Sequence, residues 1–296
     1  MPRTVLITGC SDGGLGAALA VAFHKHGDHV IATARNPAKM ASLKAMGIDT
    51  LQLDVLSEDS IKAAVQATSK MTNNSLDILV NNAGKGYSTP LMDASTSEVS
   101  KLFELNTISA LRVTQNFFPL LRNCKDGALV VNNTSCASVM PVPLQGPYSA
   151  TKAALASFSD ALRQELQPFN IKVVDLKTGT VKSNFFANAS SSGGSADGSL
   201  RLPKDSLYLP GREPVEKFMR TDIDIPVMPA DEWAMKVVRD LSKRNPPLHV
   251  WHGGNAFQVW LSSFLPVGML DSTLRKMTGL DVVERYYRGL REQKTK

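Results

Sequence analysis

Short runs of apolar residues alternate with segments of helical periodicity over the first 180 residues of the chain. The apolar runs have the length of buried strands, and they lie at residues 5–8, 29–34, 50–55, 76–81, 128–132 and 171–176. Helical segments separate them, at 15–26, 39–46, from Ser57 onwards, at 97–121 and after Pro147. Strands that alternate with helices in this way pair in parallel and are covered on both faces. The pattern predicts a three-layer α/β fold with a doubly wound sheet, whose ligands bind beyond the carboxyl ends of the strands.

The carboxyl-terminal third has a less regular pattern. We expect one domain over residues 1–296, with a cofactor-binding and catalytic core at 1–183. A mobile substrate loop at 184–229 follows, because its part at 187–199 is poor in apolar residues. The remaining 230–296 contain a helix, a last strand at 248–251 and an apolar tail. The uncharged part of this tail, 256–270, is too short to span a bilayer, so we expect a core helix or a wall of the substrate pocket there. A membrane-surface patch is the alternative.

Composition narrows the functional classes. The chain has 296 residues, of which 43% are hydrophobic, and a net charge of +6 that is not gathered into basic runs. Nucleic-acid binding is therefore not expected, whereas an anionic cofactor or substrate suits the charge. Cys10, Cys124 and Cys136 are too few and too scattered for disulfides or a metal site, which favours a reducing compartment. A strand that starts at once leaves no room for a signal peptide, so we expect a cytoplasmic protein. Because the cysteines are scattered, we expect no metal ion either.

A glycine-rich turn, TGCSDGGLG at residues 8–16, joins the first strand to the first helix. Glycines let the backbone approach a pyrophosphate, and the helix amino terminus adds amides and partial positive charge. The turn predicts a nucleotide site of the Rossmann type with Gly9, Ser11, Gly13, Gly14, Leu15 and Gly16. The second strand ends in Thr33-Ala34-Arg35 without a carboxylate, which favours the 2′-phosphate of NADP, although Asp12 argues mildly the other way.

Tyr148 and Lys152 lie four residues apart in a segment that reads as a helix, so both side chains should share one face. An ammonium beside a phenol favours the phenolate, so we expect a lowered pKa for Tyr148 and proton transfer near neutral pH. Taken alone, this pair fits an ordinary solvated helix face better. Ser135 lies thirteen residues before the tyrosine, and it is the first indication that the Tyr148/Lys152 pair has a functional role.

Together and in this order, the motifs of residues 3–183 resemble the short-chain dehydrogenase/reductase family. Asn106, Ser135, Tyr148 and Lys152 match its catalytic tetrad. The resemblance also implies further contacts to the cofactor from Asp54, Val55, Asn82, Ala83, Gly84, Gly179, Val181 and Ser183. There are two departures. The glycine turn is one residue longer, which leaves open whether Gly13 or Gly14 contacts the phosphates, and Thr178-Gly179 replaces the usual Pro-Gly, which should loosen that loop.

The resemblance implies an NADPH-dependent carbonyl reductase with Tyr148 as proton donor. Lys152 would lower the pKa of the tyrosine and hold the nicotinamide ribose, Ser135 would orient the substrate oxygen, and Asn106 would hold a relay water. The finer pattern is similar to fungal NADPH-dependent 1-acyldihydroxyacetone-phosphate reductases and, more distantly, to hydroxysteroid dehydrogenases. It implies a bulky apolar ketone or aldehyde from lipid or secondary metabolism. A homodimer or homotetramer, and peripheral contact with the endoplasmic reticulum or lipid droplets through 256–270, are further expectations. Work in the oxidative direction is an alternative.

Two readings from other classes remain to be tested. The segment Gly9-Cys10-Ser11-Asp12-Gly13 satisfies the Gly-x-Ser-x-Gly pattern of hydrolase nucleophile elbows. An acyl hydrolase would also need a late histidine, for which His249 and His252 are the candidates. The other reading is a binding protein with a vestigial site, against which the complete tetrad argues.

Overall fold

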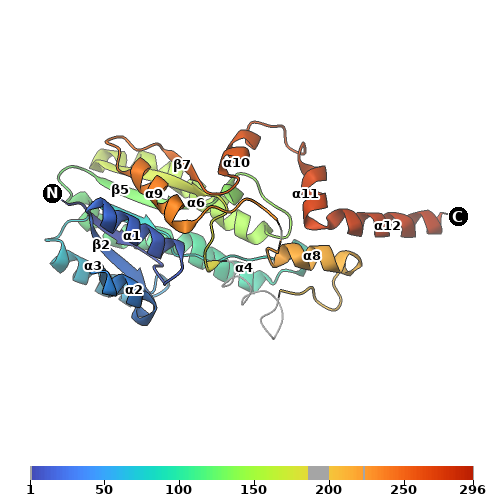
Figure 1. Cartoon of the computed structure of the whole chain (residues 1–296), viewed down its shortest axis with the longest axis horizontal. Helices are drawn as coiled ribbons and strands as arrows, with labels where there is room; N and C mark the ends of the chain where they lie inside the picture. The colour runs from blue at the N-terminus through green and yellow to red at the C-terminus, as the bar shows by residue number, and fades with distance from the viewer. Residues whose placement is uncertain (1, 186–199, 223, 296) are drawn as a thin grey trace.

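The computed structural model describes residues 2–185, 200–222 and 224–295, and its centre is a seven-stranded parallel sheet (Figure 1). The strands lie in the order β3-β2-β1-β4-β5-β6-β7. Their bounds are β1 (Thr4–Ile7), β2 (His29–Ala34), β3 (Asp49–Gln52), β4 (Ile78–Asn81), β5 (Ala128–Asn133), β6 (Ile171–Thr178) and β7 (His249–His252). The order reverses between β1 and β4, which creates the crevice where doubly wound folds bind ligands. The predicted fold class is confirmed.

Helices cover both faces of this sheet. The bounds of all described α-helices, including those away from the sheet, are α1 (Leu15–His26), α2 (Ala41–Ala45), α3 (Glu58–Met71), α4 (Thr96–Phe103), α5 (Ser109–Arg122), α6 (Gly146–Glu165), α8 (Arg212–Met219), α9 (Ala230–Leu241), α10 (Ala256–Ser262), α11 (Asp271–Thr278) and α12 (Leu280–Lys294). Successive strand residues face opposite sides: Ile7 packs in the cluster of Phe23 from α1, and Leu6 in the cluster of Phe117 from α5. Helices α1 and α9 thus cover one face, and α3, α5 and α6 the other.

Two predicted helices differ in detail from the observed ones. The segment 39–46 begins as a 3₁₀ turn at Pro37–Met40 before α2, and 97–121 is interrupted by a π turn at Glu104–Ile108 between α4 and α5. Single π turns inside α-helices are frequent at functional sites, and this one contains Asn106.

The segment 184–229 is only in part the loop that we expected. Its described residues include helix α8, and Leu200, Phe218 and Met219 are buried in one cluster with Val283 of α12. These apolar residues follow the polar stretch and form a small core that the segment shares with α12 and with Leu144. The stretch 187–199, on which the loop prediction rested, lies outside the described residues.

The apolar tail leaves the main body of the molecule. Helices α11 and α12 extend away from the sheet beside α8, and α12 reaches the carboxyl terminus (Figure 1). In α10 only Ala256 and Val259 are buried, so the expectation of a core helix for 256–270 is wrong. Phe257 and Leu261 line the large cavity described below, so the segment does form a cavity wall, and its contact with a substrate stays a prediction. Within the residues that the structure describes, no helix combines the length and apolar character needed to cross a membrane.

Candidate active site

A cavity of about 1160 Å³ opens beyond the carboxyl ends of the central strands. One part of its wall comes from the glycine turn after β1 and from the ends of β2, β4 and β5. The other part comes from the segment before α6, from Phe185, from α8, α10 and α11, and from the segment between α10 and α11. It includes Met140, Val142, Gln145, Phe185, Phe218, Met219, Phe257, Leu261, Leu265, Leu270, Leu274 and Met277. The cavity therefore has a polar end at the switch point of the sheet and a large apolar end below the carboxyl-terminal helices.

Three residues of the predicted tetrad meet in this cavity. Ser135 follows β5, while Tyr148 and Lys152 lie one turn apart on α6, and all three line the wall. Asn106 does not line it. Its side-chain nitrogen donates to the carbonyl oxygen of Lys85 at 2.9 Å and to the hydroxyl of Thr151 at 3.1 Å, and its side-chain oxygen accepts from the Lys85 amide at 2.8 Å. Asn106 thus ties α6 to the loop after β4.

The expected lowering of the tyrosine pKa is wrong for this structure. Burial raises the pKa of Tyr148 to about 12, although its hydrogen bond with Ser135 opposes the rise. Burial also lowers the pKa of Lys152 to about 8, against the charge of Asp175, which raises it. The Lys152 ammonium donates to the carbonyl oxygen of Asn133 at 2.7 Å and lies 5.9 Å from the centre of the tyrosine ring. Burial dominates because the ammonium hydrogen-bonds the backbone and not the phenol.

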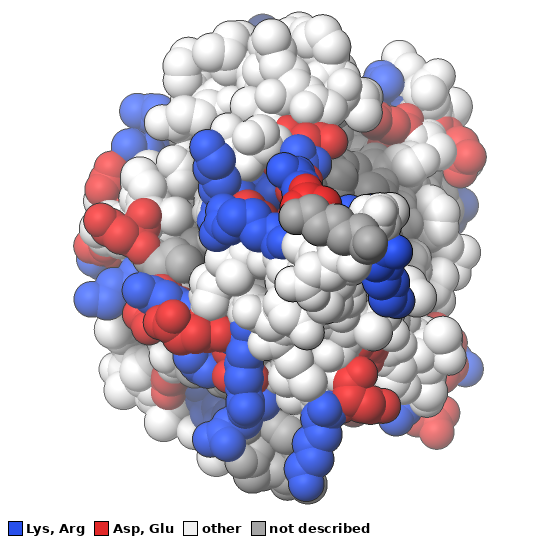
Figure 2. Space-filling model, turned by 90° about the vertical axis from the view of Figure 1, so that its right-hand side faces the viewer, with Lys and Arg blue, Asp and Glu red and all other residues white. Residues whose placement is uncertain are grey.

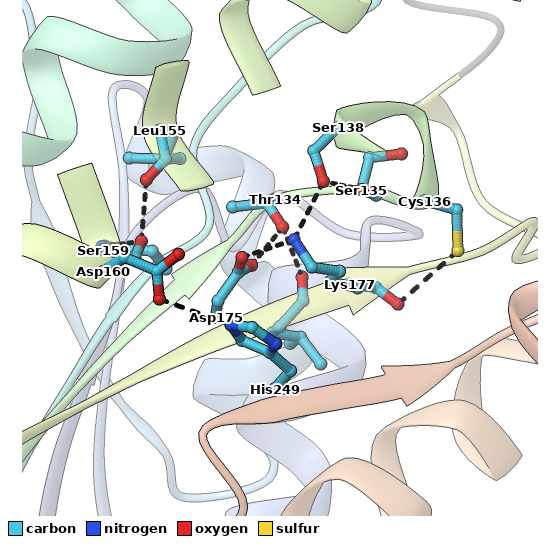
Figure 3. A network of polar contacts seen from close by, with 12 residues as sticks. Thr134, Ser135, Cys136, Ser138, Leu155, Ser159, Asp160, Asp175, Lys177 and His249 are labelled. Atoms are coloured by element: carbon cyan, nitrogen blue, oxygen red, sulfur yellow. Dashed lines mark hydrogen bonds and ion pairs between the residues drawn. The ribbon is translucent and has the colours of Figure 1, made fainter. Parts of the chain in front are cut away.

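A buried ion pair lies directly behind the turn that carries Ser135 (Figure 3). Lys177 donates to the Asp175 carboxylate at 2.6 Å and to the Ser138 hydroxyl at 3.1 Å. Ser138 in turn donates to the carbonyl oxygen of Ser135 at 2.6 Å, and the hydroxyl of Thr134 donates to Asp175. Both charged residues are almost fully buried and share one face of β6. Sequence reasoning missed them, although two opposite charges two residues apart at the end of a largely apolar strand were a usable signal.

The glycine turn lies against the loop after β4. Gly9 has a φ of +76°, and a Cβ there would lie 2.9 Å from the Cα of Ala83, so both its conformation and its space require glycine. Gly14 lines the cavity together with Gly9, Ser11 and Leu15. Gly13 accepts a hydrogen bond from the Asn184 amide at 3.0 Å, and neither Gly13 nor Gly16 lines the cavity.

Two cations line the far end of the polar part. Arg35 follows β2, and Lys39 lies four residues later in the 3₁₀ turn. Sequence reasoning did not identify Lys39, although it is the next cation in the chain after Arg35. Val55 lines the cavity here, whereas the Asp54 carboxylate accepts from the Leu56 amide at 3.0 Å and does not line it.

Asn133 links three segments at the polar end of the cavity through hydrogen bonds with Asn82, Lys152 and Thr178. Sequence reasoning did not identify it. Its side-chain nitrogen donates to the Asn82 oxygen at 2.9 Å, and its side-chain oxygen accepts from the Thr178 hydroxyl at 2.6 Å. The Thr178 hydroxyl thus ties the end of β6 to Asn133, while the expectation that the loop after it is looser than with proline stays a prediction. Six further predicted residues line the cavity at this end: Asn82, Ala83, Gly84, Gly179, Val181 and Ser183.

The hydrolase reading fails on the positions of the histidines. His252 is held by Asp240 at 2.7 Å and His249 lies 3.4 Å from Asp160, and neither lines the cavity that contains Ser11. Both lie on β7, four strands from β1 in the sheet. Strands are about 4.8 Å apart, so the nucleophile and the histidines are separated by about 19 Å. A catalytic hydrogen bond between them is impossible.

Comparison with known proteins agrees with this geometry. The family model for short chain dehydrogenases matches residues 3–193. A short-chain dehydrogenase/reductase of Pestalotiopsis microspora is 47% identical over 97% of both chains. The chain belongs to the short-chain dehydrogenase/reductase family. As a member, it is an oxidoreductase that acts on alcohol or carbonyl groups of small molecules with a nicotinamide cofactor.

Other relatives extend the comparison. An NADPH-dependent 1-acyldihydroxyacetone phosphate reductase of Schizosaccharomyces pombe is 35% identical, over 94% of this chain and 95% of its own. Among solved structures, a short-chain dehydrogenase of Streptomyces avermitilis superposes with a TM-score of 0.73 at 27% identity and covers 96% of this chain and 98% of its own. One from Burkholderia cenocepacia, solved in complex with NADP, shares the fold at 19% identity with a TM-score of 0.69, covering 94% and 97%.

Proposed function

We propose that this short-chain dehydrogenase/reductase is an NADPH-dependent carbonyl reductase that acts on a bulky apolar ketone or aldehyde. The observation that carries the proposal is the meeting of Ser135 and Tyr148 on the wall of one cavity, with the tyrosine kept protonated by burial. A protonated phenol is the form that gives a proton to a developing alkoxide, which is the step that reduction of a carbonyl requires.

The polar end of the cavity fits NADPH. Gly14 and Leu15 present the start of α1 to the cavity, where amides and partial positive charge suit a pyrophosphate. Arg35 and Lys39 supply two cations for a 2′-phosphate, and no carboxylate follows β2 to hold a free ribose hydroxyl. The Schizosaccharomyces pombe relative, which is named as NADPH-dependent, supports the same preference.

Each residue of the site has a role in this proposal. A bound reduced nicotinamide supplies the hydride for the carbonyl carbon. Tyr148 protonates the carbonyl oxygen, Ser135 donates a hydrogen bond that orients it, and Lys152 holds the ribose hydroxyls. Asn106 has an indirect role: its hydrogen bonds to Lys85 and Thr151 hold α6 in place and thereby position Tyr148. The cofactor contacts of Gly13, Gly16 and Asp54 would be indirect, because these residues shape the turns and do not line the cavity.

The apolar end supports a bulky substrate. Side chains from α8, α10 and α11 line it, and most of them are aromatic, leucine or methionine. The same tail also has an outward face: Phe257 is 66% and Phe264 69% exposed. Viewed from this end, the molecule carries a broad uncharged area at the top (Figure 2). We include peripheral contact with a lipid surface in the proposal. Cosedimentation of the protein with phosphatidylcholine vesicles, abolished in Phe264→Ser, would support this contact. Absence of cosedimentation in the wild type would contradict it.

The test of the reductase proposal is a panel assay with a matched variant. NADPH and NADH oxidation would be followed with a steroid ketone, a polyketide ketone and an acyl dihydroxyacetone phosphate. We expect turnover with NADPH on at least one bulky ketone, and a loss of roughly 10²- to 10⁴-fold in Tyr148→Phe with NADPH binding retained. Full turnover in that variant, or a strong preference for NADH, would contradict the proposal.

A further inference from the structure

Charge is distributed unequally between the two ends of the cavity. The charged residues among the described ones that line it are Asp12, Arg35, Lys39 and Lys152. The first three belong to the glycine turn, the end of β2 and the 3₁₀ turn, where the nucleotide is expected. The wall supplied by α8, α10 and α11 is uncharged throughout its described part.

The two cations of the nucleotide end cannot serve a group beside Tyr148. The sheet order places β2 three strands from β5, which leads to Ser135. At about 4.8 Å between strands, this is a separation of about 14 Å. Arg35 and Lys39 therefore act on the cofactor and not on the substrate.

Two lysines lie nearer to the reacting carbon than Arg35 and Lys39 do. Lys152 donates to the carbonyl oxygen of Asn133 at 2.7 Å. Lys177 is paired with Asp175 at 2.6 Å behind the wall and does not line the cavity. By its sequence, the stretch 186–199 contains Asp197 but neither lysine nor arginine. Among the described residues that line the cavity, Lys152 is therefore the one cation near the reacting carbon, and the proposed function assigns it to the nicotinamide ribose.

Neutral polar groups do face the substrate. Gln145 lines the cavity three residues before Tyr148, at the start of α6, and its side-chain amide has no hydrogen-bond partner within the described part of the chain. An amide both donates and accepts, so it suits a hydroxyl or a second carbonyl of an uncharged molecule. A phosphate dianion placed here would lose its hydration without a counterion, which is strongly unfavourable.

We propose that the substrate is an uncharged apolar carbonyl compound without a phosphate, and that the Gln145 amide binds an oxygen next to the reacting carbonyl. This inference rests on the proposed carbonyl reductase function. It separates the chain from the Schizosaccharomyces pombe relative with its phosphorylated substrate. In an acyl dihydroxyacetone phosphate, only a methylene and an ester oxygen lie between the carbonyl carbon and the phosphorus. The phosphate would therefore have to lie in the uncharged part of the cavity, beside Tyr148.

A pair of substrates that differ only in the phosphate tests the proposal. The kcat/KM values would be compared, with NADPH, for a 1-acyldihydroxyacetone and for its phosphate ester with the same acyl chain. We expect the neutral ketone to be preferred by at least about tenfold. Equal or better turnover of the phosphate ester would overturn the proposal.

A binding experiment keeps the charge inference separate from the proposed function. Dissociation constants would be measured by calorimetry on the NADP-loaded protein for dodecanol and dodecyl phosphate, neither of which can be reduced. Tighter binding of the alcohol supports the inference even if no ketone in the panel is turned over, in which case the reductase proposal alone fails. Equal or tighter binding of the phosphate, or no binding of either, would overturn the inference.

Two substitutions of Gln145 complete the test. Gln145→Lys places a cation beside Tyr148 and should shift the kcat/KM ratio towards the phosphate ester by about tenfold or more. Gln145→Met keeps the length of the side chain but has neither a charge nor a hydrogen-bonding amide. It should raise KM for the neutral ketone severalfold, and it should not shift the kcat/KM ratio towards the phosphate ester. An unchanged KM in Gln145→Met would remove the hydrogen bond from the proposal, and an unchanged ratio in Gln145→Lys would contradict the electrostatic argument.

Discussion

Thr178 and Asn133 join the ends of two neighbouring strands by a buried side-chain hydrogen bond of 2.6 Å. Through its other groups Asn133 also binds Asn82 and Lys152. One asparagine thus links the loop after β4, the end of β6 and the lysine of α6. Threonine stands where proline is usual in the family, and its hydroxyl supplies a constraint that a proline ring would supply through its fixed φ.

Thr178→Val should destabilise the protein by about 1–3 kcal/mol, because it leaves the buried side-chain oxygen of Asn133 without a donor while the volume stays nearly the same. Urea denaturation measures the change. Thr178→Ser keeps the hydroxyl and serves as control, with a loss well below that of valine. Equal losses in the two variants would show that the methyl group and not the hydrogen bond matters.

Lys177→Met should cost about 3–5 kcal/mol in the free energy of unfolding, because the Asp175 carboxylate then remains buried without its partner. The double variant Asp175→Val/Lys177→Met removes both charges and should recover most of this loss. Chemical denaturation of the three proteins decides the matter. If the free energy of unfolding of Lys177→Met lay within about 1 kcal/mol of the wild-type value, water or another group would have to replace the lysine.

The regular part of the fold could be predicted because each strand and helix carries its own pattern. The apolar run at 171–176 and the spacing of Tyr148 and Lys152 are local features, and the structure keeps both. The candidate catalytic residues were predicted in the same way, since family motifs are short and ordered. The contacts of Asn106 with Lys85 and Thr151 join distant segments, and no local pattern encodes them.

Long-range burial explains the predictions that failed. The pKa of Tyr148 depends on what covers the phenol, which the spacing to Lys152 does not reveal. Likewise, 256–270 is apolar in sequence, but an apolar segment can face the core, a cavity or the outside. The structure divides it between a cavity wall and an exposed surface.

Arg35→Ala should lower the preference for NADPH over NADH, measured as the ratio of kcat/KM values, by roughly 10- to 100-fold, since hydrogen bonds to charged groups contribute about 1.5–3 kcal/mol. Lys39→Ala should have a smaller effect in the same direction, because an ammonium does not bind phosphate in the bidentate manner of a guanidinium. Arg122→Ala, on the helix α5 and away from the cavity, is the matched control and should leave the ratio unchanged. An unchanged ratio in both cavity variants would assign the 2′-phosphate to other residues.

The lowered pKa of Lys152 predicts how stability depends on pH. Below pH 8 both the native and the unfolded lysine are protonated, so the cost of burying the charge is fully present. Between about pH 8 and 10.5 the native lysine loses its proton while the unfolded one keeps it, so the native state gains stability. Relative to Lys152→Met, the free energy of unfolding of the wild type should therefore rise with pH in this window, by at most about 1.4 kcal/mol per unit.

The raised pKa values of Tyr148 and the buried cysteines act in the opposite direction at high pH, but they are common to both proteins and cancel in the difference. Urea denaturation at pH 7.5, 8.5 and 9.5 would reveal the rise, and a difference that stays constant over this range would mean that the ammonium keeps its proton inside the protein.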